Sequence, residues 1–543
     1  MKILTAITLL KRFMNRKQAE ILEELIKEAV KLKVLSQRDL QSLKNRYSFK
    51  YKIGSPTNVS LIKTYRFLLE NGSIKANPVF FDMLKKRKVR SQSGIANITV
   101  LTKGYKCPGT CIFCPSEPDM PKSYLSTEPA MMRAILNDFD SYRQVKNRLK
   151  GLERTGHTTE KVEIIVAGGT FSYYPKAYQT YFVRNIFNAL NEKKFRSLKA
   201  AQDYNEKAEH RCVGLSLETR PDWITIEEIK RMRMLGATKV EIGIQSLDDE
   251  ILAANKRGHG VDAVRKAMKL LKDAGFKINA HMMPNLYKSN IQKDKDAFKK
   301  LFEDDDFKPD WLKIYPCVVT PYSQLEKLFR SGEYKPYTDE ELIDLIIVLK
   351  KIVPEYTRIA RLYRDIPAEN ILGGSKLSNL RQIVQKKMAE EGDRCKCIRC
   401  REVKDYISKE GDIELVVREY NSSGGKEFFL SFEDVKNDKL LSFLRLRFPS
   451  QIFTGEKHFI KELQNSALIR ELHTYGAHLA ILERKGSASQ HKGYGKRLLE
   501  KAEEITKKHG IKNLAVISGI GVREYYKKLG FKLKGSYMSK KAV

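Results

Sequence analysis

Three cysteines stand within eight residues of one another in the segment KCPGTCIFCP, residues 106–115. Cys107, Cys111 and Cys114 have the spacing C-x3-C-x2-C. Thiolates are the soft ligands that iron–sulfur clusters require, and three of them can hold three irons of a 4Fe–4S cube. The fourth iron is then open to a substrate or cosubstrate. A zinc loop or three unrelated thiols are the alternatives, but zinc needs a fourth ligand and the next cysteine is Cys212.

A second group of cysteines lies far along the chain, in the segment RCKCIRC, residues 394–400. Cys395, Cys397 and Cys400 form a compact C-x-C-x2-C array suited to tetrahedral zinc. Such a site needs a fourth ligand, and we favour Cys317, a thiol at the end of an expected strand. A second iron–sulfur cluster and a site completed by a histidine remain open. We expect Cys212 to be an ordinary buried strand thiol.

Length and composition bound the class of protein. The chain has 543 residues, enough for about three or four domains, and its 42% hydrophobic and 31% charged residues are typical of a globular protein. No run of 18 apolar residues occurs, so no membrane-spanning helix is expected. The first residues lack a signal-peptide cleavage pattern, and clustered cysteines favour metal over disulfides. We therefore expect a cytoplasmic protein.

The charge is strongly basic, with 101 Lys and Arg against 66 Asp and Glu, a net of +35. Residues 1–90 alone carry 21 basic and 7 acidic residues, so the surplus is concentrated there. These residues have helical periodicity and end in the basic run 85–90. A nucleic acid is the partner that such a surplus favours, although a lysine-rich proteome would also produce it. We expect residues 1–90 to be a basic helical region that binds RNA.

From residue 95 the pattern changes to short apolar runs that alternate with amphipathic helices. Expected strands are residues 95–101, 161–167, 211–219, 239–246, 276–283 and 310–317. Repeated βα units predict a parallel sheet or barrel, with its chemistry on loops at the carboxyl ends of the strands. The cysteine loop follows the first of these strands. Gly168 and Gly169, and then Glu218 and Gln245, end later strands and could hold a cosubstrate at the same edge.

These features together resemble the radical S-adenosylmethionine (SAM) enzymes. The resemblance implies that the cysteine loop holds a 4Fe–4S cluster and that the glycines, Glu218 and Gln245 bind SAM. A simple strand-to-helix turn is the alternative for Gly168 and Gly169. His281, near the end of another strand, is equally well explained as a core histidine.

The last segment has a different pattern, with several strands followed by the hexad Q-x-x-G-x-G at residues 490–495. Gln490, Gly493 and Gly495 precede an expected helix at residues 496–509, whose amino end can hold a pyrophosphate. A strand, a tyrosine-rich helix and Leu-Gly-Phe follow. This order resembles the acetyl-CoA site of the GNAT acetyltransferases.

The expected organisation is therefore an α/β multidomain chain, in which a partial (βα) barrel of the radical SAM type is fused to a GNAT fold. We place a basic helical tRNA-binding region at residues 1–90 and the radical SAM domain at 91–370. A zinc-binding linker follows at 371–403, and the GNAT domain at 404–543.

The combination resembles the Elongator catalytic subunit family in its single-chain archaeal or bacterial form. The resemblance rests on the segments KCPGTCIFCP, SYLSTEPAMMRA, VAGGTF, LETRPD, EIGIQS, NKRGH, HMMP, ELHTYG, QHKGYG and VISGIGVREYYKKLGF. It implies a tRNA wobble-uridine modifying enzyme that forms 5-carboxymethyluridine at position 34. Radical SAM chemistry on acetyl-CoA would supply the new carbon atoms. The tRNA anticodon stem-loop and acetyl-CoA are the implied partners, with no membrane, and a homodimer remains open.

The resemblance also assigns residues. Acetyl-CoA contacts are implied for Lys161 in the radical SAM domain and for Glu471, Leu472, His473, Thr474, Tyr494, Gly495, Lys496 and Tyr526 in the GNAT domain. Tyr525 and Tyr526 are candidates for thioester chemistry, and a buried aromatic pair is the alternative. Two segments depart from the family pattern: Asn285-Leu-Tyr-Lys after HMMP, and Pro115-Ser-Glu after the third cysteine. These departures concern the SAM and substrate loops and leave the family resemblance intact.

Two other functions remain open. A protein lysine acetyltransferase would use the GNAT domain alone, with Glu471 or Glu483 as general base. It would leave the cysteine loop without a role. A non-catalytic RNA-binding scaffold would hold no iron.

Overall fold

The computed structural model describes residues 16–32, 36–85, 94–404, 406, 408–475 and 493–542. The chain divides into two compact units. One comprises Met1–Asn97 with Lys146–Lys161, and the other Ile98–Val145 with Val162–Val543. None of the described helices is long and apolar enough to cross a membrane. Residues 86–90 of the basic run lie outside the described residues, as do residues 477–482 of the segment where strands are expected before the hexad.

The smaller unit is helical, as its sequence predicts. Its helices are α2 (Arg16–Lys31), α3 (Gln37–Tyr51), α4 (Asn58–Glu70) and α5 (Pro78–Leu84), with most of α7 (Ser141–Arg154). Ser36, Thr57 and Asn77 cap three of them, because each side-chain oxygen accepts a hydrogen bond from a backbone N–H three residues later. Apolar side chains at helical spacing form one core, including Leu25, Ile26, Leu61, Leu68, Phe80 and Leu84.

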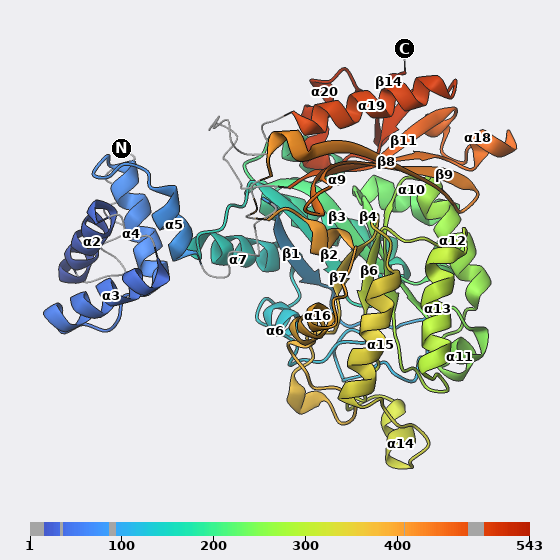
Figure 1. Cartoon of the computed structure of the whole chain (residues 1–543), viewed down its shortest axis with the longest axis horizontal. Helices are drawn as coiled ribbons and strands as arrows, with labels where there is room; N and C mark the ends of the chain where they lie inside the picture. The colour runs from blue at the N-terminus through green and yellow to red at the C-terminus, as the bar shows by residue number, and fades with distance from the viewer. Residues whose placement is uncertain are drawn as a thin grey trace. The chain divides into compact units, whose positions relative to one another are not determined.

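The larger unit contains two seven-stranded sheets (Figure 1). The first runs in chain order from β1 to β7, and its strands from β3 to β7 pair in parallel. Its strands are β1 (Ala96–Leu101), β2 (Lys161–Ala167), β3 (Arg211–Thr219), β4 (Lys239–Gln245), β5 (Lys277–Met282), β6 (Trp311–Ile314) and β7 (Arg358–Arg361). Strand order that follows chain order is what repeated βα units produce, so the predicted partial barrel is confirmed.

Helices alternate with these strands. They are α6 (Pro129–Ile135), α8 (Lys176–Leu190), α9 (Leu198–Asn205), α10 (Ile226–Leu235), α11 (Asp249–Ala254), α12 (Val261–Asp273), α13 (Ile291–Glu303), α14 (Leu325–Arg330) and α15 (Asp339–Ile352). Two further helices, α16 (Leu380–Glu390) and α17 (Ile398–Arg401), follow the barrel. Thr225 caps α10, because its side chain accepts a hydrogen bond from the Glu228 backbone N–H.

The second sheet has the order β13-β14-β12-β11-β10-β9-β8. Its strands are β8 (Ile413–Ser422), β9 (Gly425–Asp434), β10 (Lys439–Phe448), β11 (Ser466–Thr474), β12 (Asn513–Val516), β13 (Lys532–Lys534) and β14 (Tyr537–Lys541). Helices α18 (Gln451–Thr454), α19 (Tyr494–Lys508) and α20 (Arg523–Lys527) accompany it. All its pairs are antiparallel except β11 with β12.

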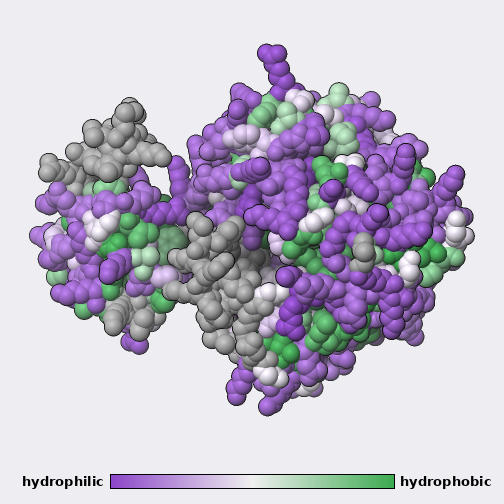
Figure 2. Space-filling model, turned by 90° about the horizontal axis from the view of Figure 1, so that it is seen from above, coloured by the Kyte–Doolittle hydropathy of each residue, from purple (hydrophilic) through white to green (hydrophobic). Residues whose placement is uncertain are grey.

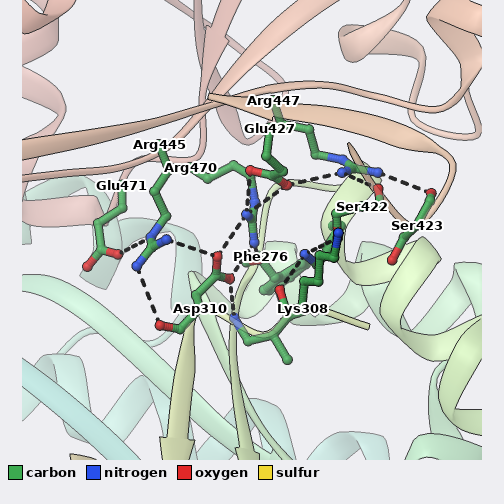
Figure 3. A network of polar contacts seen from close by, with 12 residues as sticks. Phe276, Lys308, Asp310, Ser422, Ser423, Glu427, Arg445, Arg447, Arg470 and Glu471 are labelled. Carbon is green, nitrogen blue, oxygen red and sulfur yellow. Dashed lines mark hydrogen bonds and ion pairs between the residues drawn. The ribbon is translucent and has the colours of Figure 1, made fainter. Parts of the chain in front are cut away.

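The two sheets meet at the amino ends of the barrel strands through buried ion pairs (Figure 3). Asp310, immediately before β6, accepts hydrogen bonds from Arg470 at 2.5 and 3.0 Å. Asp273, at the end of α12, accepts from Arg447 at 2.5 and 3.0 Å. Glu427 on β9 bonds to both arginines, and all five side chains are at most 1% exposed. The junction therefore excludes water and fixes the GNAT sheet on the barrel.

Outside such junctions the surface is polar. Hydrophilic residues predominate on the face seen in Figure 2, and hydrophobic ones occur in small groups. This agrees with the high charge of the sequence.

Candidate functional site

The cysteine loop follows β1 and therefore lies at the carboxyl ends of the barrel strands. Backbone hydrogen bonds hold it in place, from the Ile112 N–H to the Asn255 carbonyl at 3.2 Å and from the Leu325 N–H to the Ile112 carbonyl at 2.8 Å. Cys107 Sγ accepts from the Gly109 N–H at 3.5 Å. The loop is thus positioned by distant segments of the barrel.

Two buried arginines surround these thiols. Arg257 Nη1 donates to Cys111 Sγ at 3.3 Å, and Arg220 pairs with Asp222 at 2.9 Å. Arg220 Nη1 lies so close to Gly109 that a Cβ there would be 1.9 Å away, so only glycine fits. A hydrogen bond from Cys114, and then the charge of Arg257, lower the pKa of Cys111 to about 5.

The residues fit an iron–sulfur cluster. Two buried guanidinium atoms near the loop, Arg220 Nη1 and Arg257 Nε, have no hydrogen-bond partner. A cluster ligated by thiolates carries the negative charge that such groups attract. Among the described residues, the three sulfurs do not all lie within 4.8 Å of one another, unlike those of the second cysteine group.

The glycines after β2 form a strained turn beside the loop. Gly168 has φ 136° and Gly169 φ 93°, and a Cβ on Gly168 would lie 2.0 Å from Thr102 Oγ1. Glu218 accepts from both backbone N–H groups, at 3.2 and 3.4 Å, and from the Tyr124 hydroxyl at 2.9 Å. Glu218 therefore holds the glycine turn, a role that sequence reasoning did not foresee. Its predicted contact with SAM stays a prediction.

Gln245 ends β4 at an irregularity in the pairing with β5. It has a positive φ of 74°, and its Oε1 is buried without a hydrogen-bond partner. A buried amide oxygen that lacks a partner is costly unless a ligand supplies a donor. This geometry supports the prediction that Gln245 faces a cosubstrate.

The barrel interior is polar around Glu241. This carboxylate accepts from Lys313 at 2.7 Å, Asn279 at 2.8 Å and Ser216 at 3.1 Å, and lies 2.9 Å from His281 Nε2. Burial, and then the charge of Lys313, lower the pKa of His281. His281 is therefore a neutral, hydrogen-bonded core side chain.

A second candidate site lies in the GNAT sheet, where two parallel strands separate. Ser466–Ile469 of β11 pair with Asn513–Val516 of β12, and β11 then continues to Thr474 without β12. The register with β10 skips Arg470, so β11 bulges there. The edge of β11 beyond the bulge presents backbone groups that β12 does not pair, which an extended ligand can use.

The amino end of α19 meets this edge. Gly493, with φ 72°, caps the helix, and Tyr494, Gly495 and Lys496 form its first turn. A Cβ on Gly495 would lie 3.5 Å from the Tyr525 hydroxyl, 3.9 Å from Thr474 Oγ1 and 4.0 Å from Leu472 Cδ2. The structure thus brings together predicted acetyl-CoA residues from β11, α19 and α20. Gln490 lies outside the described residues.

Two of the predicted residues have other roles. The bulge turns Glu471 toward the barrel, where Arg445 donates to it at 2.9 Å and Lys277 lies 3.8 Å away. Glu471 is therefore an ion-paired junction residue, and its side chain does not serve as a general base. Tyr526 packs edge-on against Phe531 in the sheet core, whereas Tyr525 is 43% exposed and presents its hydroxyl to Gly495.

His473 is partly buried, with its ring between those of Phe443 and Tyr475. Burial lowers its pKa to about 4, so the imidazole is neutral. Its Nε2 has no hydrogen-bond partner, which leaves it available to a ligand. Lys161 begins β2, at the opposite end of that strand from Gly168, and its predicted contact with acetyl-CoA stays a prediction.

The second cysteine group comes together as predicted. The Sγ atoms of Cys395, Cys397 and Cys400 lie within 4.8 Å of one another. Tetrahedral zinc with Zn–S bonds of 2.3 Å would hold them about 3.8 Å apart, so the group fits zinc. Hydrogen bonds from Cys395 and Cys400 hold the pKa of Cys397 well below its usual range.

The predicted fourth ligand, Cys317, is not in this group. It packs in the apolar cluster that contains Cys111 and Tyr334, and burial raises its pKa to about 12. The backbone of β6 carries Cys317 to the carboxyl end of the barrel, away from the linker. The ligand set that the structure supports is therefore Cys395, Cys397 and Cys400, without Cys317.

Comparisons with known proteins agree with this architecture. Residues 101–301 match the radical SAM superfamily, residues 309–390 the radical SAM C-terminal domain, and residues 402–531 the acetyltransferase (GNAT) family. The predicted fusion of a radical SAM barrel with a GNAT fold is confirmed.

Whole-length relatives exist as well. The tRNA uridine(34) acetyltransferase of Methanocaldococcus infernus is 44% identical over 537 residues, 96% of this chain and 98% of that protein. Elongator complex protein 3 of Schizosaccharomyces pombe is 39% identical, over 96% of this chain and 97% of that protein. The solved structure of the archaeal M. infernus Elp3, with residues 1–46 deleted, superposes with a TM-score of 0.73 at 43% identity. It covers 83% of this chain and 99% of that one.

Proposed function

This chain belongs to the family of the tRNA uridine(34) acetyltransferases and Elongator complex protein 3, and we propose on that premise that it forms 5-carboxymethyluridine at position 34 of tRNA. The acetyl group of acetyl-CoA supplies the two carbons. One observation carries the proposal. The cysteine loop and the opened β11 edge with α19 belong to a single compact unit, joined by a buried ionic junction.

The radical SAM family implies a 4Fe–4S cluster and SAM, which together supply a radical that can activate an unreactive C–H bond. In this chain Cys107, Cys111 and Cys114 would hold the cluster, and Arg257 hydrogen-bonds to one of the sulfurs. Gly168, Gly169 and Gln245 line the same edge, where backbone and amide groups would orient SAM. The apolar residues beside Cys111 keep water from this edge.

The GNAT family implies acetyl-CoA. Its pyrophosphate would lie at the amino end of α19, where Gly493 and Gly495 leave backbone N–H groups accessible and the helix dipole favours anions. Its extended arm would follow the part of β11 that continues beyond its pairing with β12, near Leu472. Burial raises the pKa of Tyr525, so this hydroxyl stays protonated at neutral pH and can donate to the thioester.

The partners follow from charge and chemistry. We assign the basic helices of residues 1–90 to the tRNA anticodon stem-loop, because a localised positive surplus binds phosphates. The cytoplasm is the compartment that fits, since it keeps the thiols of such a chain reduced. A monomer and a homodimer fit the described surface equally.

The direct test supplies labelled acetyl-CoA, SAM and a reductant to the anaerobically reconstituted protein with tRNA. We expect label in nucleoside 34 of a tRNA with uridine there, and none in a matched tRNA with cytidine at 34. Replacing all three loop cysteines by alanine should abolish the product. Labelled uridine formed by that triple variant, or no product from the iron-loaded wild type, would contradict the proposal.

Protein lysine acetylation is the less well supported of the two candidate functions. Glu471, one of its two candidate bases, is held by Arg445, and hydrogen bonding and charge from its neighbours lower its pKa against the effect of burial. The other candidate, Glu483, lies outside the described residues. Transfer of label to lysine by the triple-alanine variant at the wild-type rate would favour this function instead.

A further inference from the structure

A cavity of about 300 Å³ opens beside the second cysteine group. Cys395 and Cys400 form part of its wall, together with side chains from the end of α15, from α16 and from the turn between β9 and β10. It belongs to the larger unit and lies apart from the residues assigned to SAM and acetyl-CoA. Nothing in the proposed reaction uses it.

The cysteine group leaves one metal position to be filled. Zinc in proteins is almost always four-coordinate, and three thiolates supply three ligands. Among the described residues, no further histidine, cysteine, aspartate or glutamate joins the cluster of sulfur atoms. Two of the three sulfurs border the cavity, so the fourth position can face it.

A buried lysine lines the same cavity. Lys350 on α15 is 0% exposed, and its Nζ has no hydrogen-bond partner. It lines the cavity together with Cys395 and Cys400, which places the ammonium near the sulfur atoms. A buried ammonium that lacks an acceptor is costly, so an occupant with acceptor oxygens would stabilise it.

The acidic residues of the cavity do not meet that need, because other cations bind them. Asp393 accepts from Lys351 at 2.7 Å, and Asp438 accepts from Arg401 at 2.6 Å with Arg394 at 3.5 Å. Lys439 adds a further positive charge to the wall. The cavity therefore combines a metal position, a free ammonium and carboxylates that are already neutralised.

We propose that this cavity is an oxyanion site of the phosphate class, in which one anion oxygen binds zinc at the fourth position and another accepts a hydrogen bond from Lys350. Zinc accepts oxygen ligands in open sites, and lysine binds phosphate as a point charge. The anion can be a free phosphate or a backbone phosphate of RNA. The RNA source rests on the proposed function, whereas the anion site does not.

Cobalt(II) substitution tests the site without any turnover. The visible absorption of cobalt depends on its ligands and geometry, so an anion that enters the coordination sphere changes the spectrum. Inorganic phosphate is titrated into the cobalt-loaded wild type and into Lys350→Met and Lys386→Met. Lys386 on α16 is the control, because its side chain is 79% exposed, pairs with Glu390 and does not line the cavity.

We expect phosphate to shift the wild-type spectrum saturably. Lys350→Met should weaken phosphate binding about tenfold or more, as expected for a lost charged hydrogen bond, and Lys386→Met less than twofold. Circular dichroism and cobalt content confirm that each variant is folded and loaded. A wild-type spectrum that phosphate leaves unchanged, or equal phosphate affinity in Lys350→Met, overturns the proposal.

A second arm identifies the source of the anion. An anticodon hairpin RNA is titrated in place of phosphate, and then in competition with it. A spectral shift by RNA that phosphate reverses assigns the site to an RNA phosphate, and a shift by phosphate alone assigns it to a free anion. Both outcomes support the oxyanion site. Neither depends on uridine modification, so the labelling experiment can fail while the oxyanion site is still observed.

Discussion

At the carboxyl ends of the barrel strands, buried polar atoms around the cysteine loop lack partners, whereas at the amino ends the buried carboxylates are bound by arginines. Arg220 Nη1, Arg257 Nε and Gln245 Oε1 are buried and unpaired near the loop. At the other end Asp310 accepts two hydrogen bonds from Arg470 of the GNAT sheet (Figure 3). Asp273 likewise accepts two from Arg447. One barrel therefore buries polar groups in two ways: without a partner at the cysteine loop, and in ion pairs at the junction with the GNAT sheet.

The two ends differ in what faces the buried cations. At the junction Arg445 Nη1 and Arg470 Nε also lack hydrogen bonds, but a carboxylate lies against each of these arginines, whereas Arg257 at the loop bonds to a sulfur and a backbone carbonyl. A buried polar group without a partner bears the desolvation cost alone, so we expect a ligand to complete it at the loop. We infer that the carboxyl end is built for chemistry and the amino end for joining two domains.

The largest expected effect is at the carboxyl end. Cys111→Ala should abolish uridine modification and remove the iron, because one of three thiolates and the partner of Arg257 are lost. Iron and sulfide assays with the anaerobic absorbance spectrum measure this. Zinc content and the melting temperature should change little, and a variant that retained full iron would break the distinction between the two ends.

At the amino end the large effect should be on stability. Asp310→Asn removes one of the two carboxylates that bind the buried Arg470 and leaves only Glu427, which Arg470 shares with Arg447, so we expect a loss of about 3–5 kcal/mol in the free energy of unfolding. Denaturant unfolding measures it. Lys199→Met, which removes an ion pair whose side chains are 71% and 48% exposed, is the control and should cost less than about 1 kcal/mol. Equal losses in the two variants would show that the junction contributes no special stability.

The pH dependence of stability should also report on the amino end. Burial lowers the pKa of Lys272 to about 7 from its usual 10.5, although Glu427 and Asp310 oppose the shift. Between these two values the unfolded chain binds the extra proton, so this group makes the protein more stable as pH rises from about 7 to 10. The slope is at most about 1.4 kcal/mol per pH unit.

Lys272→Met should flatten that part of the stability curve, as measured by urea unfolding at a series of pH values. The exposed Lys199→Met variant should leave the slope unchanged. A Lys272→Met curve parallel to the wild type would mean that the lysine stays charged in the junction.

The smallest effect should be a change in the reduction potential of the cluster at the carboxyl end. Arg257→Met should keep the three thiolates and the iron, but remove a cationic hydrogen bond to Cys111 Sγ. The midpoint potential of the cluster should fall, on the order of 50 mV, because the added electron is less well stabilised. A redox titration followed by electron paramagnetic resonance measures it, and an unchanged or higher potential would contradict this role.

Much of the carboxyl end could be predicted from local spacing. The three loop cysteines and the Gly168-Gly169 turn are short motifs, and their chemistry depends on residues close together in the chain. The partners of those motifs could not be predicted in this way. Arg257 stands 146 residues from Cys111, and Glu218 stands 50 residues from Gly168. No periodicity in the sequence indicates such contacts.

The same limit explains the corrections. Glu471 belongs to a segment that resembles an acetyl-CoA contact, but a one-residue bulge at Arg470 turns its side chain toward Arg445. Cys317 is a reasonable zinc ligand by elimination, but the end of β6 carries it into the apolar cluster beside Cys111. In both cases the register or the direction of a strand decided the role.

The sequence by itself therefore determined the classes of chemistry, since thiolate spacing, glycine turns and the periodicity of βα units are local properties that the chain carries wherever it folds. Only the tertiary structure decided which buried polar groups are satisfied. Pairing Asp310 with Arg470 across 160 residues, and leaving Arg220 Nη1 without a partner, both depend on how separate sheets and loops pack together.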